Sequence, residues 1–356
     1  MSEEVRIRKS IQELPGYKAG ARAQAVSGFT PYKLSSNENP LNPLPSVVAV
    51  IAKVAESINR YPDPLATELT ARLSERFQVD PNCIALGTGS VGVCQQIVQA
   101  LCDAGDEVIF AWRSFEAYPI ITAIAGAVSV RVPLTQSGEH DLVAMAQAIT
   151  DRTRVIFICT PNNPTGSIVK NQDLIDFLTK VPTNVLVVID EAYIEFNRDE
   201  LAIDGLGAYR GFSNVAVLRT FSKAYGLAGL RVGYLIGPEV LAEAVRKTAV
   251  PFGVSSLAQA AAIASIDHEN ELLDRVDNLV ALRTWFESAL ADLGFQLPAS
   301  QANFIWLPLG ARSEQFAKQC ADVAVAVRTF AGEGVRISIG EREALEVLLP
   351  ICAQYV

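Results

Sequence analysis

Short apolar runs rich in β-branched residues alternate with helix-like stretches through the middle of the chain, from about residue 83 to residue 237. Each run has the length of a strand and is followed by glycine, proline or polar residues. Strands that alternate with helices in this way form a mostly parallel sheet with helices on both faces. The pattern therefore predicts an α/β fold, and in open sheets of this kind ligands bind just past the carboxyl ends of the strands.

One of these runs, Val215–Leu218, leads into a polar segment that contains a lysine. Thr220 and Ser222 precede Lys223, and Arg231 follows it by eight residues, after a glycine-rich turn. A lysine amine can form a Schiff base with an aldehyde, while hydroxyls and a guanidinium bind a phosphate dianion. The segment therefore predicts a site for a cofactor that carries both groups. For an isolated Ser-Lys pair, a solvated loop lysine would be the simpler interpretation.

The whole segment, Thr-Phe-Ser-Lys-Ala-Tyr-Gly-Leu-Ala-Gly-Leu-Arg-Val-Gly-Tyr, closely resembles the lysine signature of class I/II pyridoxal-phosphate aminotransferases. It is most similar to the branch that contains the histidinol-phosphate and aromatic amino-acid aminotransferases. The resemblance covers nearly the whole chain and implies the fold-type I architecture, in which a smaller α+β domain accompanies the cofactor domain. It also implies pyridoxal 5′-phosphate as cofactor, Lys223 as the catalytic residue and a homodimer with shared active sites.

The chain is long enough for one large and one small domain, since it has 356 residues of which half are hydrophobic and 19% are charged. The alternation of strands and helices ends near Gly237, and helix-rich sequence follows. We therefore expect an N-terminal arm over residues 1–35, a large cofactor-binding domain over 36–237 and a small domain over 238–356.

The charge and the scarce residue types exclude several classes of function. A net charge of −9 and a pI near 5.0 disfavour nucleic acid as a partner. No apolar run reaches membrane-spanning length and the start, Met-Ser-Glu-Glu-Val-Arg, has no apolar signal core, so we expect a cytoplasmic protein. The six cysteines suit reduced core thiols. His140 and His268 are expected on the surface, and no metal site is predicted.

A buried carboxylate is predicted at the end of the run Val185–Ile189, where Asp190 follows five apolar residues. Such a group needs a cationic partner, and a protonated pyridine nitrogen is one. By resemblance, Asp190 holds that nitrogen, while Asn163 of the Asn-Pro-Thr-Gly string and Tyr193 contact the cofactor's phenolic oxygen. An aspartate that caps the next helix is the alternative.

A phosphate site is predicted after the strand Cys83–Leu86, where small residues lead into a helix expected from about Val93. Backbone N–H groups at such a turn bind anions. The resemblance assigns Gly89, Ser90 and Val91 to this role. The chain departs from the commoner family pattern here, because Val-Gly replaces an acidic pair.

Two aromatic residues complete the predicted cofactor site. Phe115 follows the strand Glu107–Ala111 and by resemblance stacks on the pyridine ring, although a core aromatic would show the same spacing. Tyr61 stands before Asp63, a predicted helix N-cap. By resemblance Tyr61 reaches the cofactor phosphate of the other subunit.

The substrate side is predicted from arginines and from two N-terminal loops. Arg336 lies in an alternating apolar strand, and its geometry suits a carboxylate. The resemblance assigns it to the substrate α-carboxylate, with Arg328 as a second candidate for an anionic group. Tyr17, in the turn Leu-Pro-Gly-Tyr, and Asn39, in a loop typical of the branch, are further predicted substrate contacts.

The sequence therefore predicts an aminotransferase that moves the amino group of an aromatic amino acid, phenylalanine first, to 2-oxoglutarate by a ping-pong mechanism. The words Arg-Ser-Phe-Glu-Ala-Tyr favour the aromatic subgroup. Histidinol-phosphate aminotransferase is the first alternative. A decarboxylase acting on a phosphorylated amino acid, and a regulatory protein that binds the cofactor without turnover, are lower alternatives.

Overall fold

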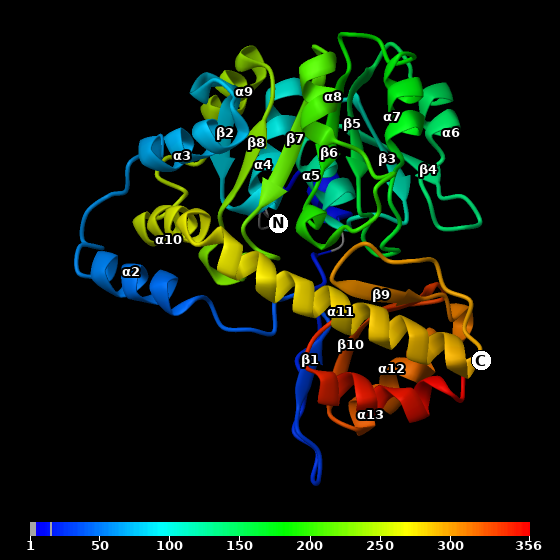
Figure 1. The fold of residues 1–356 in the computed structure, drawn as a ribbon. Coiled ribbons are helices and arrows are strands. Elements are labelled where there is room, and N and C mark those ends of the chain that lie inside the picture. Colours follow the sequence, from blue (N-terminus) through cyan, green and yellow to red (C-terminus); the bar gives the residue numbers. More distant parts are fainter. Residues whose placement is uncertain (1–4, 15) are drawn as a thin grey trace.

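The computed structural model describes residues 5–14 and 16–356, and these form two sheets with helices around them (Figure 1). Residues 1–4 and Pro15, which belong to the expected N-terminal arm and its Leu-Pro-Gly-Tyr turn, lie outside the described residues. The larger sheet has seven strands in the order β2-β8-β7-β6-β5-β3-β4 within the described ranges. Its strands are β2 (Ile84–Gly87), β3 (Glu107–Trp112), β4 (Val128–Pro133), β5 (Thr153–Cys159), β6 (Leu186–Asp190), β7 (Val215–Thr220) and β8 (Gly233–Ile236).

Strands β4, β3, β5, β6 and β7 are parallel, and only β8 runs against its two neighbours. The predicted mostly parallel sheet is thus confirmed. Side chains of β3 alternate between two apolar layers: Val108 and Phe110 belong to one, Ile109 and Ala111 to the other. The first layer includes residues of α4 (Gly89–Leu101), α5 (Ala117–Ala125) and α9 (Glu239–Lys247), and the second those of α6 (Leu142–Gln147), α7 (Asn171–Leu178) and α8 (Gly205–Gly211).

The smaller sheet has the order β1-β10-β11-β9, with β10 and β11 forming an antiparallel hairpin. Its strands are β1 (Tyr32–Leu34), β9 (Phe304–Leu307), β10 (Val325–Phe330) and β11 (Gly334–Ser338). The remaining helices are α1 (Lys9–Gln12), α2 (Pro45–Ala55), α3 (Thr67–Phe77), α10 (Ser256–Asp267), α11 (Glu269–Leu293), α12 (Ser313–Asp322) and α13 (Arg342–Cys352). The long helix α11 extends from the helices beside the large sheet to the small sheet (Figure 1).

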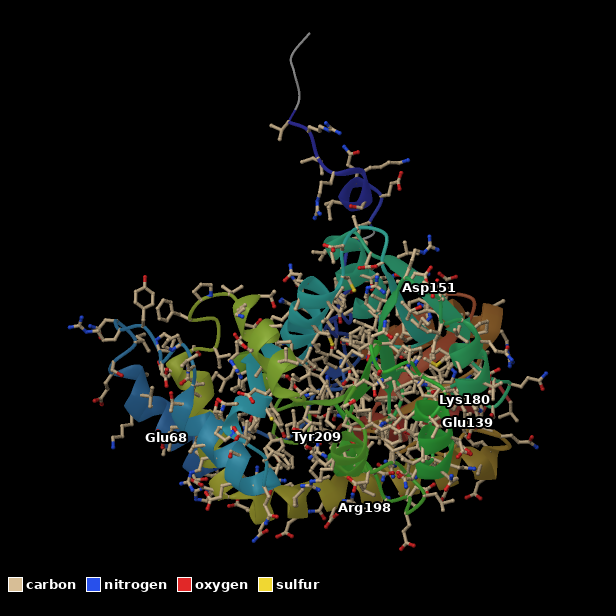
Figure 2. All side chains as sticks on the ribbon, turned by 90° about the horizontal axis from the view of Figure 1, so that it is seen from above. Glu68, Glu139, Asp151, Lys180, Arg198 and Tyr209 are labelled. Atoms are coloured by element: carbon tan, nitrogen blue, oxygen red, sulfur yellow. The ribbon has the colours of Figure 1, made fainter. Side chains whose placement is uncertain are left out.

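The N-terminal segment before β1 projects from the body of the molecule, as the dark blue ribbon in Figure 2 shows. It is anchored where the Arg8 guanidinium donates to the Ile124 carbonyl of α5 at 3.0 Å. The segment leads into β1, which pairs in parallel with β10 through Tyr32–Leu34. Residues from both ends of the chain therefore build the small sheet.

Two helices start elsewhere than the sequence predicts. Helix α4 begins at Gly89 rather than near Val93, so the glycine-rich turn is the first turn of the helix. Helix α3 begins at Thr67, with Ala66 at the N-cap, so Asp63 is not the cap. The Asp63 carboxylate instead accepts hydrogen bonds from the Leu65 and Thr67 amides at 2.9 and 2.7 Å, and this stabilises the turn before the helix.

His140 is buried, and the prediction of a surface position for it was wrong. The neighbouring Asp141 caps α6 by accepting a hydrogen bond from the Ala144 amide. The His140 ring lies inside, with Nε2 3.3 Å from Asn162 Oδ1. Burial lowers the pKa of His140 to about 4, so the ring is neutral at pH 7. His268 is exposed, as expected.

None of the helices within residues 5–14 and 16–356 is long and apolar enough to span a bilayer. The six cysteines carry free thiols, and Cys94, Cys159, Cys320 and Cys352 are buried.

Candidate active site

A cavity of about 220 Å³ lies at the carboxyl ends of the parallel strands, beneath the hairpin of the small sheet. Polar residues that follow β3, β5, β6 and β7 meet there because parallel strands end at one edge of their sheet. The predicted site residues that line the cavity are Tyr17, Ser90, Val91, Phe115, Asn163, Asp190, Tyr193, Thr220, Ser222, Lys223, Arg231, Arg328 and Arg336.

Lys223 presents its amine to the cavity just beyond β7. Its Nζ donates to the backbone carbonyls of Ser36 and Asn37 at 3.4 and 3.3 Å. Burial, and next the positive charge of Arg336, lower the pKa of Lys223 to about 7. A large fraction of the side chains is therefore the neutral amine near neutral pH, which is the form that attacks a carbonyl.

Asp190 ends β6 and is only 3% exposed. The Tyr118 hydroxyl donates to its Oδ2 at 2.7 Å, whereas Oδ1 has no hydrogen-bond partner among the described residues. Burial raises the pKa of Asp190 to about 6, and the Tyr118 hydrogen bond opposes that rise. A buried acceptor with one free oxygen beside a cavity suits a cationic N–H group of a ligand.

An anion site is formed where the first turn of α4 meets the segment after β7. The Thr220 hydroxyl lies 3.0 Å from that of Ser222, which in turn accepts from Arg231 Nη1 at 3.2 Å. Helix α4 directs the amides of its first turn, including that of Ser90, toward the same end of the cavity. Gly89 has φ +77°, and a Cβ there would collide with Arg231 Nη2, so a larger residue would displace the guanidinium from its present position.

Arg336, on β11, is buried and only partly satisfied. It donates through Nη1 to Asn163 Oδ1 at 2.5 Å and through Nη2 to the Ser35 carbonyl at 2.9 Å. Its Nε finds no acceptor in the described part of the chain. Burial lowers the pKa of Arg336. A buried guanidinium with a free donor favours a carboxylate ligand.

Tyr193 lies in the cavity wall close to Lys223, whose Nζ is 5.7 Å from the centre of the phenol ring. The Tyr193 hydroxyl accepts a hydrogen bond from Asn37 Nδ2 at 3.0 Å. Phe115 also lines the cavity and packs edge-on against Tyr118 with ring centres 5.5 Å apart.

Arg328 also points into the cavity, but its charge is already paired. Its Nη2 donates to Glu116 Oε2 at 2.6 Å and its Nη1 to the Ala19 carbonyl at 3.1 Å. Arg328 is 6% exposed at the side chain and Glu116 30%. The two arginines of the hairpin therefore differ: Arg336 has a free donor for a ligand, whereas the charge of Arg328 is paired with Glu116.

Three predicted site residues do not line the cavity. Gly89 lies directly behind it, against Arg231. The Asn39 side chain is turned toward the backbone, because its Nδ2 donates to the Ala224 carbonyl at 3.1 Å and its Oδ1 accepts from the Leu41 amide. Tyr61 is 81% exposed and stacks on Phe252 with ring centres 4.5 Å apart.

The sequence interpretation assigned no role to three cavity residues, Ser36, Asn37 and Glu116, or to Tyr118, which contacts the lining residues Asp190 and Phe115. Tyr118 stands three residues after Phe115, at the start of α5, and an aromatic in a first helical turn beside a strand end is a usable signal for a residue behind the site. Asn37 has a left-handed backbone, φ 52°, and its amide donates to Ser338 Oγ across 301 residues. No local pattern predicts such a contact.

The sequence pattern of the family "Aminotransferase class I and II" matches residues 30–350. The chain belongs to this family. An aminotransferase of this family exchanges an amino group between amino-acid and 2-oxo-acid substrates, and the chain is an enzyme of that kind. The prediction of family, fold and enzyme class is confirmed.

Two curated relatives of this aminotransferase match along nearly their whole length. An aromatic amino acid aminotransferase from Streptomyces coelicolor is 57% identical over 98% of this chain and 97% of that protein. One from Thermobifida fusca is 51% identical over the same shares. Among solved structures, histidinol-phosphate aminotransferase from Sinorhizobium meliloti, in complex with pyridoxal-5′-phosphate, has a TM-score of 0.87 at 26% identity, covering 99% of this chain and 98% of that one. Aspartate aminotransferase from Thermus thermophilus, with a TM-score of 0.82 and 21% identity over 99% of this chain and all of that one, shares the fold.

Proposed function

We propose that this enzyme transfers the amino group of an aromatic amino acid to 2-oxoglutarate, with pyridoxal 5′-phosphate as cofactor. The observation that carries the proposal is the free Nε of the buried Arg336 in the same cavity as the Lys223 amine and the free oxygen of Asp190. These groups suit an α-carboxylate, an aldehyde and a pyridinium nitrogen. The names of the Streptomyces and Thermobifida relatives support the aromatic donor.

The residues of the cavity fit the cofactor. Asp190 Oδ1 is an orphaned buried acceptor for the ring nitrogen. The amides of α4, the Thr220 and Ser222 hydroxyls and Arg231 form a cradle for the phosphate, and a Cβ at Gly89 would collide with the guanidinium of that cradle. Phe115 offers a flat wall, and Asn163 and Tyr193 offer polar groups for the phenolic oxygen. When bound, the cofactor supplies an aldehyde carbon and a ring that accepts the electron pair released at the substrate Cα.

The chain's own groups orient the substrate and move its proton. Arg336 holds the α-carboxylate, which leaves the amino group and the Cα–H facing Lys223. The Lys223 amine is neutral near its pKa of about 7, so its Nζ accepts the Cα proton as a base and returns a proton as an acid. Asp190, ionised above its pKa of about 6, keeps the opposite side of the cavity negative.

A homodimer completes the proposal. The stacked pair Tyr61 and Phe252 is exposed on this subunit and does not line its own cavity, and it suits a contact with a second copy in which Tyr61 reaches the partner's phosphate cradle. We also retain the division into an arm over residues 1–35, a cofactor domain over 36–237 and a small domain over 238–356, which the two separate sheets support. A cytoplasmic location stays a prediction.

The test compares kcat/KM for phenylalanine and for histidinol phosphate with 2-oxoglutarate as acceptor. We expect phenylalanine to be preferred by at least about tenfold, a difference of roughly 1.4 kcal/mol. A tenfold preference for histidinol phosphate would replace the proposal with that alternative. Release of CO2 would identify a decarboxylase.

The assignment of Lys223 is tested separately. Lys223→Ala is expected to lose the near-ultraviolet absorbance of covalently bound cofactor and at least about 10³-fold in turnover, since both nucleophile and base are removed. Lys170→Ala, at the exposed edge of α7, is the control and keeps both. Full turnover in Lys223→Ala would refute the role.

A further inference from the structure

The two arginines of the hairpin stand directly opposite each other, because Arg328 and Arg336 are register partners of β10 and β11. Side chains of such partners project from the same face of a sheet. Both guanidinium groups are buried, and the positive charge of Arg328 contributes to lowering the pKa of Arg336. Two like charges therefore face one small cavity.

Glu116 offsets one of them. It follows Phe115 in the segment between β3 and α5, where it is the N-cap residue of α5, and its carboxylate accepts a hydrogen bond from Arg328 of the hairpin. Arg336, Arg328 and Glu116 together carry a net charge of about +1, which balances a single carboxylate. Without the Glu116 charge the same wall would carry about +2, which would balance a phosphate dianion or a substrate with two anionic groups.

We propose that Glu116 is a specificity-determining residue that reserves the cavity for amino donors whose anionic group is a single carboxylate. The proposal rests on the proposed function and extends it to the charge of the substrate. Histidinol phosphate carries a phosphate ester in place of the carboxylate, and this group, with a charge of −1.5 to −2 at pH 7, would have to displace the Glu116 carboxylate from Arg328 or lie beside it as a like charge. The carboxylate of an aromatic amino acid has a charge of −1 and demands neither. The second carboxylate of 2-oxoglutarate meets the same obstacle, so Glu116 also weakens binding of the acceptor.

The test uses the holoenzyme and three variants: Glu116→Gln, Arg328→Gln and the double variant. Glutamine keeps the size of Glu116 and removes its charge. Single-turnover half-reactions with phenylalanine and with histidinol phosphate leave the acceptor out of the comparison. In Glu116→Gln we expect the ratio of kcat/KM for histidinol phosphate over phenylalanine to rise about tenfold or more, through a lower KM. The double variant is expected to lose this gain, because the released cation is gone.

Binding of unreactive carboxylates supplies a second readout. In Glu116→Gln the dissociation constant of 3-phosphonopropionate is expected to fall at least fivefold while that of 3-phenylpropionate changes less than about twofold, and KM for 2-oxoglutarate is expected to fall. Glu333→Gln is the matched control. It breaks the contact between Glu333 and Arg113, which joins the same hairpin to the same strand end outside the cavity wall, and it is expected to leave every ratio unchanged.

The outcomes separate this inference from the proposed function. An unchanged ratio in Glu116→Gln, or an equal loss for both donors, overturns the role of Glu116 even when the wild type uses phenylalanine well. A gain that persists in the double variant also overturns it. Failure of the wild type to transaminate phenylalanine instead overturns the proposed function, on which the role of Glu116 rests.

Discussion

At the scale of single residues, the contact that distinguishes this site is the one between Tyr118 and Asp190. The Tyr118 hydroxyl donates to Asp190 Oδ2, so Asp190 Oδ1 is left as the acceptor for the ligand. It also stabilises the charged form of the carboxyl group, in opposition to burial. Tyr118 is therefore a positioning residue that acts on the cofactor through Asp190.

Tyr118→Phe is expected to weaken cofactor binding by about tenfold and to raise the pKa of Asp190 further, since a hydrogen bond to a charged group contributes roughly 1.5–3 kcal/mol. Equilibrium binding of pyridoxal phosphate to the apo-protein, measured across pH 5–8, checks both effects. Tyr355→Phe is the control, because it removes a hydroxyl that donates to Gln319 Oε1 of α12 at 2.6 Å, and neither residue lines the cavity. Similar cofactor affinities in the two variants would contradict the role of Tyr118.

The depressed pKa of Lys223 predicts a pH dependence. The neutral amine is the reactive form, so the rate at which the apo-protein reacts with pyridoxal phosphate should rise with pH to a midpoint of about 7, rather than near the ordinary lysine value of 10.5. Stopped-flow absorbance measures this rate. Arg336→Gln removes a neighbouring positive charge and should move the midpoint upward; a midpoint that stays in place would show that this charge does not act on the amine.

At the scale of elements, the strand ends were well predicted and the helix starts were not. Apolar runs such as that of β6 end where Asp190 appears, because a carboxylate tolerates burial only with a partner. Helix α4 starts four residues earlier than the sequence predicts. Gly89 and Gly92 have low helical propensity and so hide this turn, but the surrounding structure makes it part of the helix. His140 was misplaced because its acidic neighbours indicate solvent, whereas the Asp141 cap turns the ring inward.

Gly89→Ala tests the cradle that this early start creates. A Cβ there would collide with Arg231, so the affinity of the protein for pyridoxal phosphate should fall by more than about tenfold. Gly105→Ala is the matched control, because Gly105 also has a positive φ, +92°, but open space around it. Both variants are expected to lose roughly 1 kcal/mol of unfolding free energy. Binding of pyridoxal phosphate should separate them, and equal affinities would show that the close approach to Arg231 is unimportant.

At the scale of the whole molecule, the cavity lies where the two sheets meet. The residues that follow strands of the large sheet can be predicted from the sequence better than the contacts made by the small sheet. Lys223, Asp190 and Asn163 follow strands and could be found by their motifs. The Asn37 contacts with Tyr193 and Ser338, and the pairing of Glu116 with Arg328, join segments more than 150 residues apart. Such contacts depend on how the hairpin docks, which local patterns do not encode.

The proposed dimer predicts complementation between subunits. Mixing inactive Lys223→Ala with Tyr61→Ala, under conditions that exchange subunits, should yield hybrid dimers in which one of the two sites has both Lys223 and the partner's Tyr61. Activity above the sum of the separate preparations is expected, with light scattering to confirm the dimer. Lys223→Ala mixed with Leu201→Ala, an exposed residue that does not line the cavity, is the control for exchange alone. Additive activities in the Tyr61 mixture would argue that each site is complete within one subunit.

Arg328 and Arg336 face one another on the same hairpin, so their relative position depends on the register of its two strands. A one-residue insertion at the tip would slide one strand past the other and turn its arginine to the opposite face. A relative that acquired such a register shift through one insertion would lose one anion-binding arginine from the cavity and gain apolar surface in its place. The chemistry of the lysine would be unchanged.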